Sequence, residues 1–418
     1  MSKLKIFRNI IIIIILSSIS ATILMIAIQL LPTKHMSGHV AESVDALSSE
    51  GLYPNWAGGD TYATGDNFTD SIMLRICIYD GDESIVQKAL LNTSWWVDVP
   101  GLDYIQILAF SFDDSLPRST SIYPRYWHGY EIILKPLLLF FNVHEIRILN
   151  MFFQLLFLSL CIMLIAEKLG KKYVPILLIT LLGINPITCA ISFQFSCIYY
   201  ITLLTIIYLL WKRDSICENN GYIYLFLMDG ILCAFFDFLT YPLVALAIPL
   251  IFFIIADNKN RFIKNVIIPP IAWAFGYGFQ WASKWIISYI LTGYNTIKDA
   301  VDQAKYRTNG NMGIPESHGR LSAIESNFNI FSKSPQLIIF LLIAFIYIII
   351  IIKKAILDKG FKLSKTTLLK IIPLIVVILY PFVWYIVMFN HSYIHIFIAY
   401  RNVSIFAAGI IATLIVLL

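Results

Sequence analysis

Charged side chains are scarce in this chain of 418 residues, since Asp, Glu, Lys and Arg together make up 14% of it. Hydrophobic residues account for 58%, aromatic residues for 15%, and the mean hydropathy is +0.75. A soluble domain cannot hide so much apolar surface in its core, so the composition excludes a soluble protein and makes lipid the main solvent. The net charge of +5 gives no indication of nucleic-acid binding.

Cysteine patterns are equally uninformative. The chain has six cysteines and no CxxC motif, and five of the six lie in or beside long apolar runs, with Cys77 as the exception. This excludes a disulfide framework of the kind that staples small secreted domains. Internal repeats and long charge runs are also absent from the sequence.

What the sequence does have is a series of apolar runs, most of about 17 to 23 residues, the length needed to cross a hydrocarbon layer about 30 Å thick. Only helices satisfy every backbone group within such a segment, so we predict an all-α polytopic membrane protein. The pair 222–239 and 241–256 is short, and we expect two helices that meet at a turn around Pro242. About ten spans are predicted, at residues 10–31, 148–165, 173–191, 195–211, 222–239, 241–256, 266–290, 337–352, 371–388 and 394–418.

The distribution of charge predicts the orientation. On this topology about 17 of the 31 basic residues fall in cytoplasmic segments, against about 5 of the 26 acidic ones. We therefore expect both termini in the cytoplasm, Lys212 and Lys354 inside, and Asp66 and Asn390 outside. The first span is too long for a signal-peptide core and is predicted to be retained.

Two long segments lie outside on this reading, and function is expected there. The predicted organisation is a first span in 1–31, a large extracytoplasmic loop in 32–147, spans two to seven in 148–291, a second outer loop in 292–336 and the last three spans in 337–418. The first loop alternates turn clusters with apolar stretches, which favours a folded cap over a tether. Residues 132–141 are too few to span and contain Pro136, so we expect an interfacial or re-entrant helix there.

Three carboxylates, Asp60, Asp66 and Asp70, lie within eleven positions of this loop. Asp66 and Asp70 are four apart, so one helical face can present both. A close carboxylate pair can provide a general base or hold a divalent cation. The alternative interpretation is structural, with Asp66 or Thr69 capping a helix that continues through residues 72–78.

A second group combines cations with aromatic rings near the expected headgroup level. Arg125, Trp127 and His128 lie in the stretch RYWHGY, and Lys135 follows seven residues after His128. Sugars stack on such rings, and phosphates pair with Arg and Lys. An aromatic belt with snorkelling cations is the alternative, and it explains His128 less well.

Ionisable residues at the outer ends of spans are the remaining candidates. Asp237 lies near the outer end of its span and is favoured over Asp229, although an interhelical hydrogen bond is an equally good interpretation of either. His391 and His395 are four apart and are followed by Arg401. Two histidines are a weak metal signal, whereas an anion clamp with Arg401 matches phosphate better. Further positive charge around the second outer loop comes from Lys284, Lys305 and Arg307.

The stretches GDNFTDS (65–71), RYWHGY (125–130), DFLTYP (237–242) and NHSYIH with YR (390–401), set in this architecture, resemble the GT-C superfamily of membrane glycosyltransferases. The chain is similar to bacterial members that decorate wall polysaccharides or teichoic acids. The resemblance implies a polyprenyl-phosphate sugar donor, and a catalytic carboxylate in the first external loop, here Asp70 or Asp66, with Asp70 preferred.

The implied mechanism is a single displacement. A carboxylate deprotonates the acceptor hydroxyl, which attacks the anomeric carbon with inversion, while Arg and His stabilise the leaving lipid phosphate. Two rival functions are a lipid-linked oligosaccharide flippase, which usually shows paired repeats with broken helices, and an O-antigen-type polymerase, which lacks such a large first loop. Polar residues crowd the outer edge here, which favours an enzyme working on that face.

Overall fold

The computed structural model describes residues 3–113, 115–218, 220–257, 262–308, 319–357 and 364–418. The fold is almost entirely helical, which confirms the predicted all-α class. Parts of two expected cytoplasmic connections, residues 258–261 and 358–363, lie outside the described residues, as do residues 309–318 of the second outer loop.

The described helices divide into a bundle and a cap. Those of the bundle are α1 (Lys3–Ile28), α8 (Val143–Lys168), α9 (Val174–Ile184), α10 (Pro186–Ile191), α11 (Phe193–Trp211), α12 (Arg213–Glu218), α13 (Gly221–Phe236), α14 (Leu243–Ala256), α15 (Phe262–Thr292), α18 (Pro335–Leu357), α19 (Lys365–Ile378), α20 (Tyr380–Val387) and α23 (Val403–Leu417). Within the described residues, six helical segments are long and apolar enough to cross a membrane, and α13 and α14 are shorter apolar helices. These helices make the chain a multi-span membrane protein, while the number ten remains a prediction.

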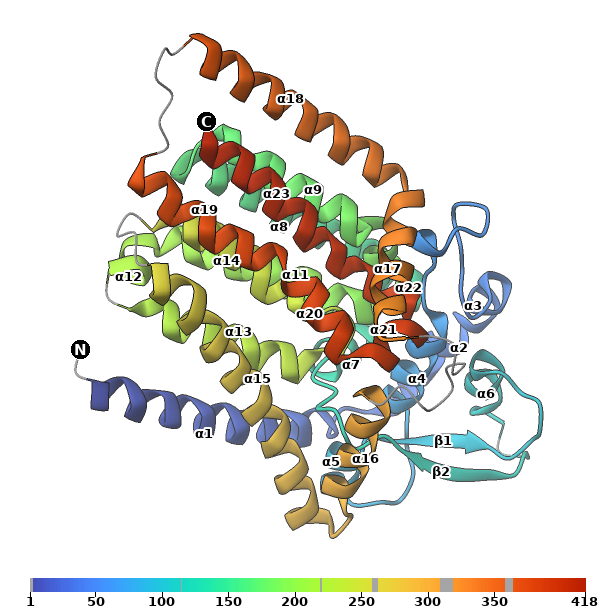
Figure 1. Cartoon of the computed structure of the whole chain (residues 1–418). Coiled ribbons are helices and arrows are strands. Elements are labelled where there is room, and N and C mark those ends of the chain that lie inside the picture. The colour runs from blue at the N-terminus through green and yellow to red at the C-terminus, as the bar shows by residue number, and fades with distance from the viewer. Residues whose placement is uncertain (1–2, 114, 219, 258–261, 309–318, 358–363) are drawn as a thin grey trace.

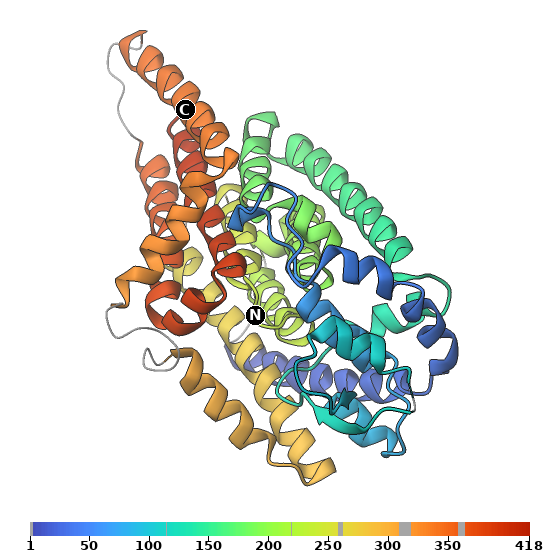
Figure 2. The ribbon, with the colours of Figure 1, turned by 90° about the vertical axis from the view of Figure 1, so that its right-hand side faces the viewer.

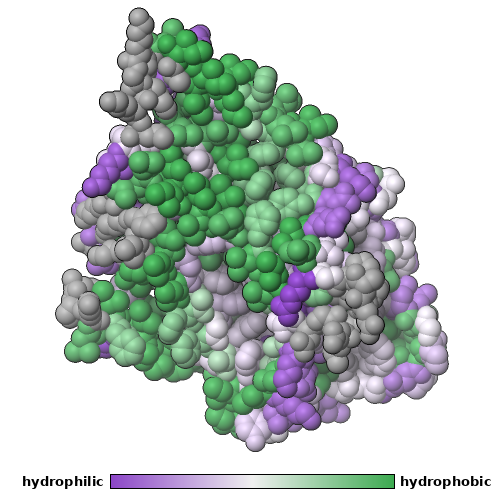
Figure 3. Space-filling view, viewed as in Figure 1, coloured by the Kyte–Doolittle hydropathy of each residue, from purple (hydrophilic) through white to green (hydrophobic). Residues whose placement is uncertain are grey.

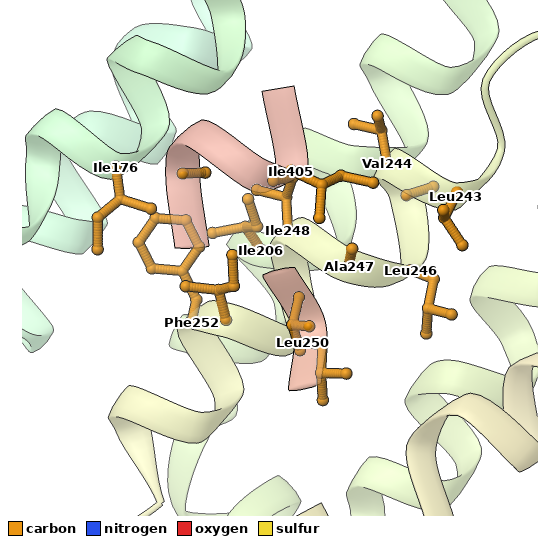
Figure 4. Packing of buried hydrophobic residues seen from close by; sticks show 14 of the residues in the cluster. Ile176, Ile206, Leu243, Val244, Leu246, Ala247, Ile248, Leu250, Phe252 and Ile405 are labelled. Atoms are coloured by element: carbon orange, nitrogen blue, oxygen red, sulfur yellow. The ribbon is translucent and has the colours of Figure 1, made fainter. Parts of the chain in front are cut away.

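Helix α14 forms the centre of the bundle. All of its residues are buried, and it is apolar on every side, as expected of a helix with no face toward water. By contrast, α1 and α18 leave most of their apolar side chains exposed, which suits contact with lipid. Around α14 pack Ile176 of α9, Ile206 of α11 and Ile405 of α23, next to its own Val244, Ile248 and Phe252 (Figure 4).

Two of the predicted spans are interrupted. The span expected at 173–191 is divided into α9 and α10 at Asn185, whose φ of 61° is left-handed. The span expected at 371–388 is divided into α19 and α20 at Leu379. In both cases a proline, Pro186 or Pro381, opens the second helix, because its fixed φ and missing N–H suit a first turn.

The segment between α1 and α8, predicted to lie outside, folds into a cap. It comprises α2 (Thr33–Ala41), α3 (Val44–Glu50), the 3₁₀ turn η1 (Thr61–Ala63), α4 (Asn67–Cys77), α5 (Ile85–Leu91), α6 (Tyr104–Phe110) and α7 (Glu131–Leu138). An antiparallel hairpin of β1 (Thr93–Val97) and β2 (Arg118–Ile122), in which Trp95 pairs with Thr120, was not expected from the sequence. Pro136 lies inside α7, which continues to Leu138.

The cap sits at one end of the bundle, and both chain termini lie at the other (Figure 1). Viewed from the cap end, the helices α2 to α7 cover one side of the bundle, next to α16 (Thr296–Thr308) and α17 (Leu321–Lys333) of the second outer segment (Figure 2). The bundle surface is predominantly hydrophobic and the cap end is predominantly polar (Figure 3). The short elements α21 (Phe389–Ile394), α22 (Ile396–Ala399) and η3 (Tyr400–Asn402) close the bundle at the cap end.

Candidate functional site

Asp66 lies at the N-cap of α4, where the cap meets the bundle. Its carboxylate accepts hydrogen bonds from the Thr69 backbone N–H at 2.9 Å and the Thr69 hydroxyl at 3.0 Å, so the capping geometry is present. A further hydrogen bond comes from the Gln194 side chain of α11, and the Asp66 side chain is buried. Burial raises the pKa of Asp66 to about 6, while hydrogen bonds from Thr69 and Gln194 act in the opposite direction.

Asp70 lies one turn further along α4 and is fully buried. Both of its carboxylate oxygens accept from the Phe193 backbone N–H, at 3.0 and 3.1 Å, which places Asp70 at the first turn of α11. Arg147 of α8 approaches to 4.0 Å and is itself held by Glu50 at 2.9 Å. Burial raises the pKa of Asp70 to about 8, with Arg147 lowering it and the charge of Asp66 raising it further.

The expected pairing of the two carboxylates is thus realised against the N-terminal end of α11. Ser192, just before α11, accepts a hydrogen bond from the Asp66 backbone N–H at 2.9 Å. A helix N-terminus favours negative charge, because its backbone N–H groups are unpaired and its dipole is positive there. Ser192, Gln194 and Arg147 were not identified from the sequence. The position of Gln194, a polar side chain at the head of an apolar run, is a sequence signal that could have identified this end of α11.

Arg401 lies near this pair but is engaged by the bundle. Its Nε donates to the Ile184 carbonyl at 2.9 Å, and its Nη2 donates to the Thr188 hydroxyl at 2.7 Å. Its guanidinium lies 4.0 Å from the centre of the Phe195 ring. The positive charge acts on Asp66 and lowers its pKa, although burial dominates. Arg401 therefore bridges the interruption between α9 and α10 on one side and η3 on the other.

The two histidines associate with Arg307. His391 and His395 have ring centres 5.0 Å apart, and Arg307 Nη1 lies 3.1 Å from His391 Nδ1. Burial holds the pKa of His391 well below its ordinary value, and His395 and Arg307 act in the same direction. A neutral His391 can accept a hydrogen bond from one N–H group of Arg307. The other N–H groups of the guanidinium can then bind an anion. The described arginine in contact with His391 is thus Arg307, whereas the sequence grouped the two histidines with Arg401.

Asp237 lies at the turn between α13 and α14, as the sequence indicated. It accepts from the Thr240 backbone N–H at 2.9 Å and from the Thr240 hydroxyl, and it is buried. The turn is strained, because Leu239 has a φ of 66°. Burial raises the pKa of Tyr126, and Arg307 and Asp237 are among the charges that act on this hydroxyl. Asp237 therefore faces the same region of the cap end as Arg307.

The remaining candidates are held by other partners. Arg125 forms an ion pair with Asp299 of α16 at 3.2 Å, and Trp127 is buried and donates to the Gln280 carbonyl at 2.7 Å. His128 is buried with its Nε2 2.8 Å from the Tyr123 carbonyl.

Lys135 is the most heavily engaged of these residues. It is buried, forms an ion pair with Glu131 at 3.3 Å and donates to Gln29, the residue that follows α1, at 2.5 Å. Asn92 donates to Glu131 at 3.0 Å and accepts from Lys284 of α15 at 3.0 Å. We call these five residues the ionic network; it ties the cap to α1 and α15. Among the described residues, no group of three His, Cys, Asp or Glu is placed to hold a metal ion, so the carboxylate pair gains no third acidic or histidine ligand there.

Comparison with models of protein families, with curated proteins and with solved structures gave no match to this chain.

Proposed function

We propose that this protein is a membrane glycosyltransferase of the GT-C type, which transfers a sugar from a polyprenyl-phosphate donor to a cell-envelope polysaccharide or teichoic acid. The observation that carries the proposal is the buried pair of Asp66 and Asp70 where the cap meets the bundle. Buried like charges with raised pKa values are typical of acid–base sites. With both termini in the cytoplasm, this pair works on the outer face of the cytoplasmic membrane.

Within the pair, Asp66 is the better general base. With a pKa of about 6 it is mostly ionised at neutral pH, whereas Asp70, with a pKa of about 8, keeps its proton. Asp66 also lies closer to the surface, beside the half-buried Phe68 and Thr69. The sequence alone favoured Asp70, whose carboxyl is instead engaged by the first turn of α11.

The donor phosphate is assigned to the neighbouring cluster of Arg307, His391 and His395. Among the described residues Arg307 contacts His391 and the Tyr306 ring, both uncharged partners beside which a guanidinium can pair with an anion. An Arg fork matches phosphate oxygens and stabilises charge that develops on the leaving group. Asp66 then removes the proton of the acceptor hydroxyl, and direct attack on the anomeric carbon inverts it.

Substitution of Asp66 by Asn tests the proposal. Asn caps a helix about as well as Asp, so Asp66→Asn keeps the fold but loses the base, and transfer should fall by roughly 10²-fold or more. The measurement is mass analysis of envelope polysaccharide from cells lacking the protein, complemented with wild type, Asp66→Asn or Asp70→Asn.

We expect wild type to restore a sugar substituent, Asp66→Asn to fail, and Asp70→Asn to retain part of the activity. Polysaccharide that is identical with and without the protein would overturn the transferase function. Full modification with Asp66→Asn would remove Asp66 from the chemistry.

A further inference from the structure

Five aromatic rings form a continuous row across the cap end. The row comprises Phe397 of α22, Tyr53, Phe68 of α4, Tyr104 of α6 and Trp96 of β1, and we call it the aromatic strip. Successive ring centres are 5.4, 6.2, 4.0 and 5.9 Å apart. Residues from three parts of the chain, around positions 53–68, 96–104 and 397, thus share one line of rings.

The strip is accessible along its length. Tyr53 is 48% exposed, and the other four rings are half-buried. Aromatic side chains that serve only as core are normally covered, whereas half-exposed rings in contact with one another present a continuous apolar surface. Four of the five rings belong to the cap, on the polar end of the molecule and beyond the hydrophobic surface of the bundle (Figure 3). This position disfavours lipid chains as the occupant.

The strip passes beside the candidate base at its second and third rings, Tyr53 and Phe68. The Leu52 carbonyl accepts from the Asn67 and Phe68 backbone N–H groups, at 2.9 and 3.2 Å, and Pro54 accepts from Gly65 at 2.7 Å. These bonds fix Tyr53 against the N-terminus of α4, where Asp66 is the cap. A chain lying along the rings therefore passes next to Asp66.

Arg75 holds the end of the strip formed by Tyr104 and Trp96. Its guanidinium lies 5.6 Å from the Trp96 ring centre and 5.4 Å from that of Tyr104, and the side chain is 3% exposed. It also donates to the Trp95 carbonyl at 3.0 Å, which fixes it between α4 and β1. Cation–π contacts of this kind orient rings before a ligand arrives, and preorganised surfaces bind with less loss of entropy.

We propose that the aromatic strip binds the glycan chain of the acceptor and holds it beside Asp66. The apolar C–H faces of pyranose rings match a row of aromatic faces, and a row of five rings suits a polymer better than a single sugar. This inference rests on the proposed function for the identity of the ligand as an acceptor. The carboxylate pair alone provides no binding site for the acceptor, and the aromatic strip supplies one.

Glycan binding without donor tests the strip independently of catalysis. The probe is a fluorescently labelled soluble fragment of the envelope polysaccharide from the producing cells, titrated against the purified full chain. Tyr53→Ala and Trp96→Ala should each weaken binding by roughly 3- to 10-fold, the usual worth of one aromatic contact. Tyr53→Phe, which keeps the ring, should bind as wild type does. Phe140→Ala removes a cap ring that is 72% exposed but outside the strip, and it should have no effect.

Three outcomes would overturn the proposed glycan site: wild-type protein that binds no glycan, strip variants that bind glycan normally, or Phe140→Ala weakening binding as much as the strip variants do. A lipid occupant is detected with Tyr53→Cys and a water-soluble maleimide. Protection by the glycan fragment supports the proposal, whereas protection on transfer from detergent to phospholipid nanodiscs without glycan overturns it. Strip-dependent binding by a protein that transfers no sugar would refute the transferase function and leave the glycan site standing.

Discussion

Two groups of charged residues are buried where the cap meets the bundle, and their charges are satisfied in opposite ways. In the ionic network the carboxylate of Glu131 faces the ammonium of Lys135, and amides fill the remaining positions. The carboxylate pair consists of two acidic groups, Asp66 and Asp70, whose closest partners are mostly neutral donors. The first arrangement fixes a structure, whereas the second keeps a proton exchangeable, which acid–base chemistry requires.

The two groups also join different helices: the ionic network anchors the cap, whereas the carboxylate pair lies beside an accessible surface. The network joins α7 to α1 and α15, so it fastens the cap to helices on one side of the bundle. The carboxylate pair joins α4 to α11, next to the half-exposed surface of Tyr53 and Phe68. Lys135, which the sequence placed among the substrate ligands, lies in the first group.

Removal of Lys135 should have the largest effect on stability. Lys135→Met leaves the carboxylate of Glu131 buried without its closest cation, which typically costs about 3–5 kcal/mol. Unfolding of the purified protein, followed by denaturant titration in mixed micelles, measures this loss. Transfer activity per folded molecule should stay near the wild-type value.

The double variant Lys135→Met with Glu131→Leu provides the control, since it removes both charges together and should recover part of the lost stability. If Lys135→Met were as stable as wild type but inactive, Lys135 would belong with the substrate ligands and the contrast between the two groups would fail.

The pH dependence of transfer should be the next largest effect. Asp66 must be ionised to accept a proton, so the rate should fall about tenfold per pH unit below its pKa of about 6 and level off above it. The profile of kcat/KM between pH 4.5 and 9 measures this. A rate that instead keeps rising up to about pH 8 and levels off only above it would assign the base to Asp70, whose pKa is about 8.

The features of the fold and of the two buried groups that depend on local residue spacing could be predicted from the sequence. The separation of Asp66 and Asp70 by four residues predicted a shared helical face, and α4 provides it. The apolar runs predicted an all-α membrane protein, and the turn at Thr240 to Pro242 separates two short helices as expected. Glu131 and Lys135 also have the spacing of a helical ion pair, a signal that the sequence contained.

The rest depended on contacts between distant segments. Gln194 reaches Asp66 across 128 positions, and Arg307 reaches His391 across 84. No local pattern specifies such pairs, because helix packing and the interruption at Asn185 decide which faces meet. For the same reason the sequence grouped the histidines with nearby Arg401, whereas packing brings Arg307 to them.

A moderate effect is expected for Arg307. Arg307→Gln removes the charge assigned to the donor phosphate, and KM for the lipid donor should rise about tenfold or more while KM for the acceptor stays constant. Kinetics with each substrate varied in turn measure the two constants. Arg401→Gln is the matched comparison, because it should lower stability through loss of the Ile184 and Thr188 contacts. If Arg401→Gln instead folded normally and had a raised KM for the donor, Arg401 would be assigned as the residue that binds the donor phosphate.

The smallest effect should come from Arg125, which contrasts with both buried groups. Its ion pair with Asp299 leaves each side chain 23% exposed, and pairs in such partly solvated positions contribute roughly 0–1 kcal/mol. Arg125→Gln should therefore lower the free energy of unfolding by no more than about 1 kcal/mol, and added salt should reduce the difference further. The sequence suggested instead that Arg125 binds substrate, and that role predicts a raised KM at unchanged stability. Asp299→Asn separates the two interpretations, since it breaks the same ion pair without removing a cation. Equal, small effects of the two variants on unfolding, with both KM values unchanged, would fix Arg125 as a link between the cap and α16.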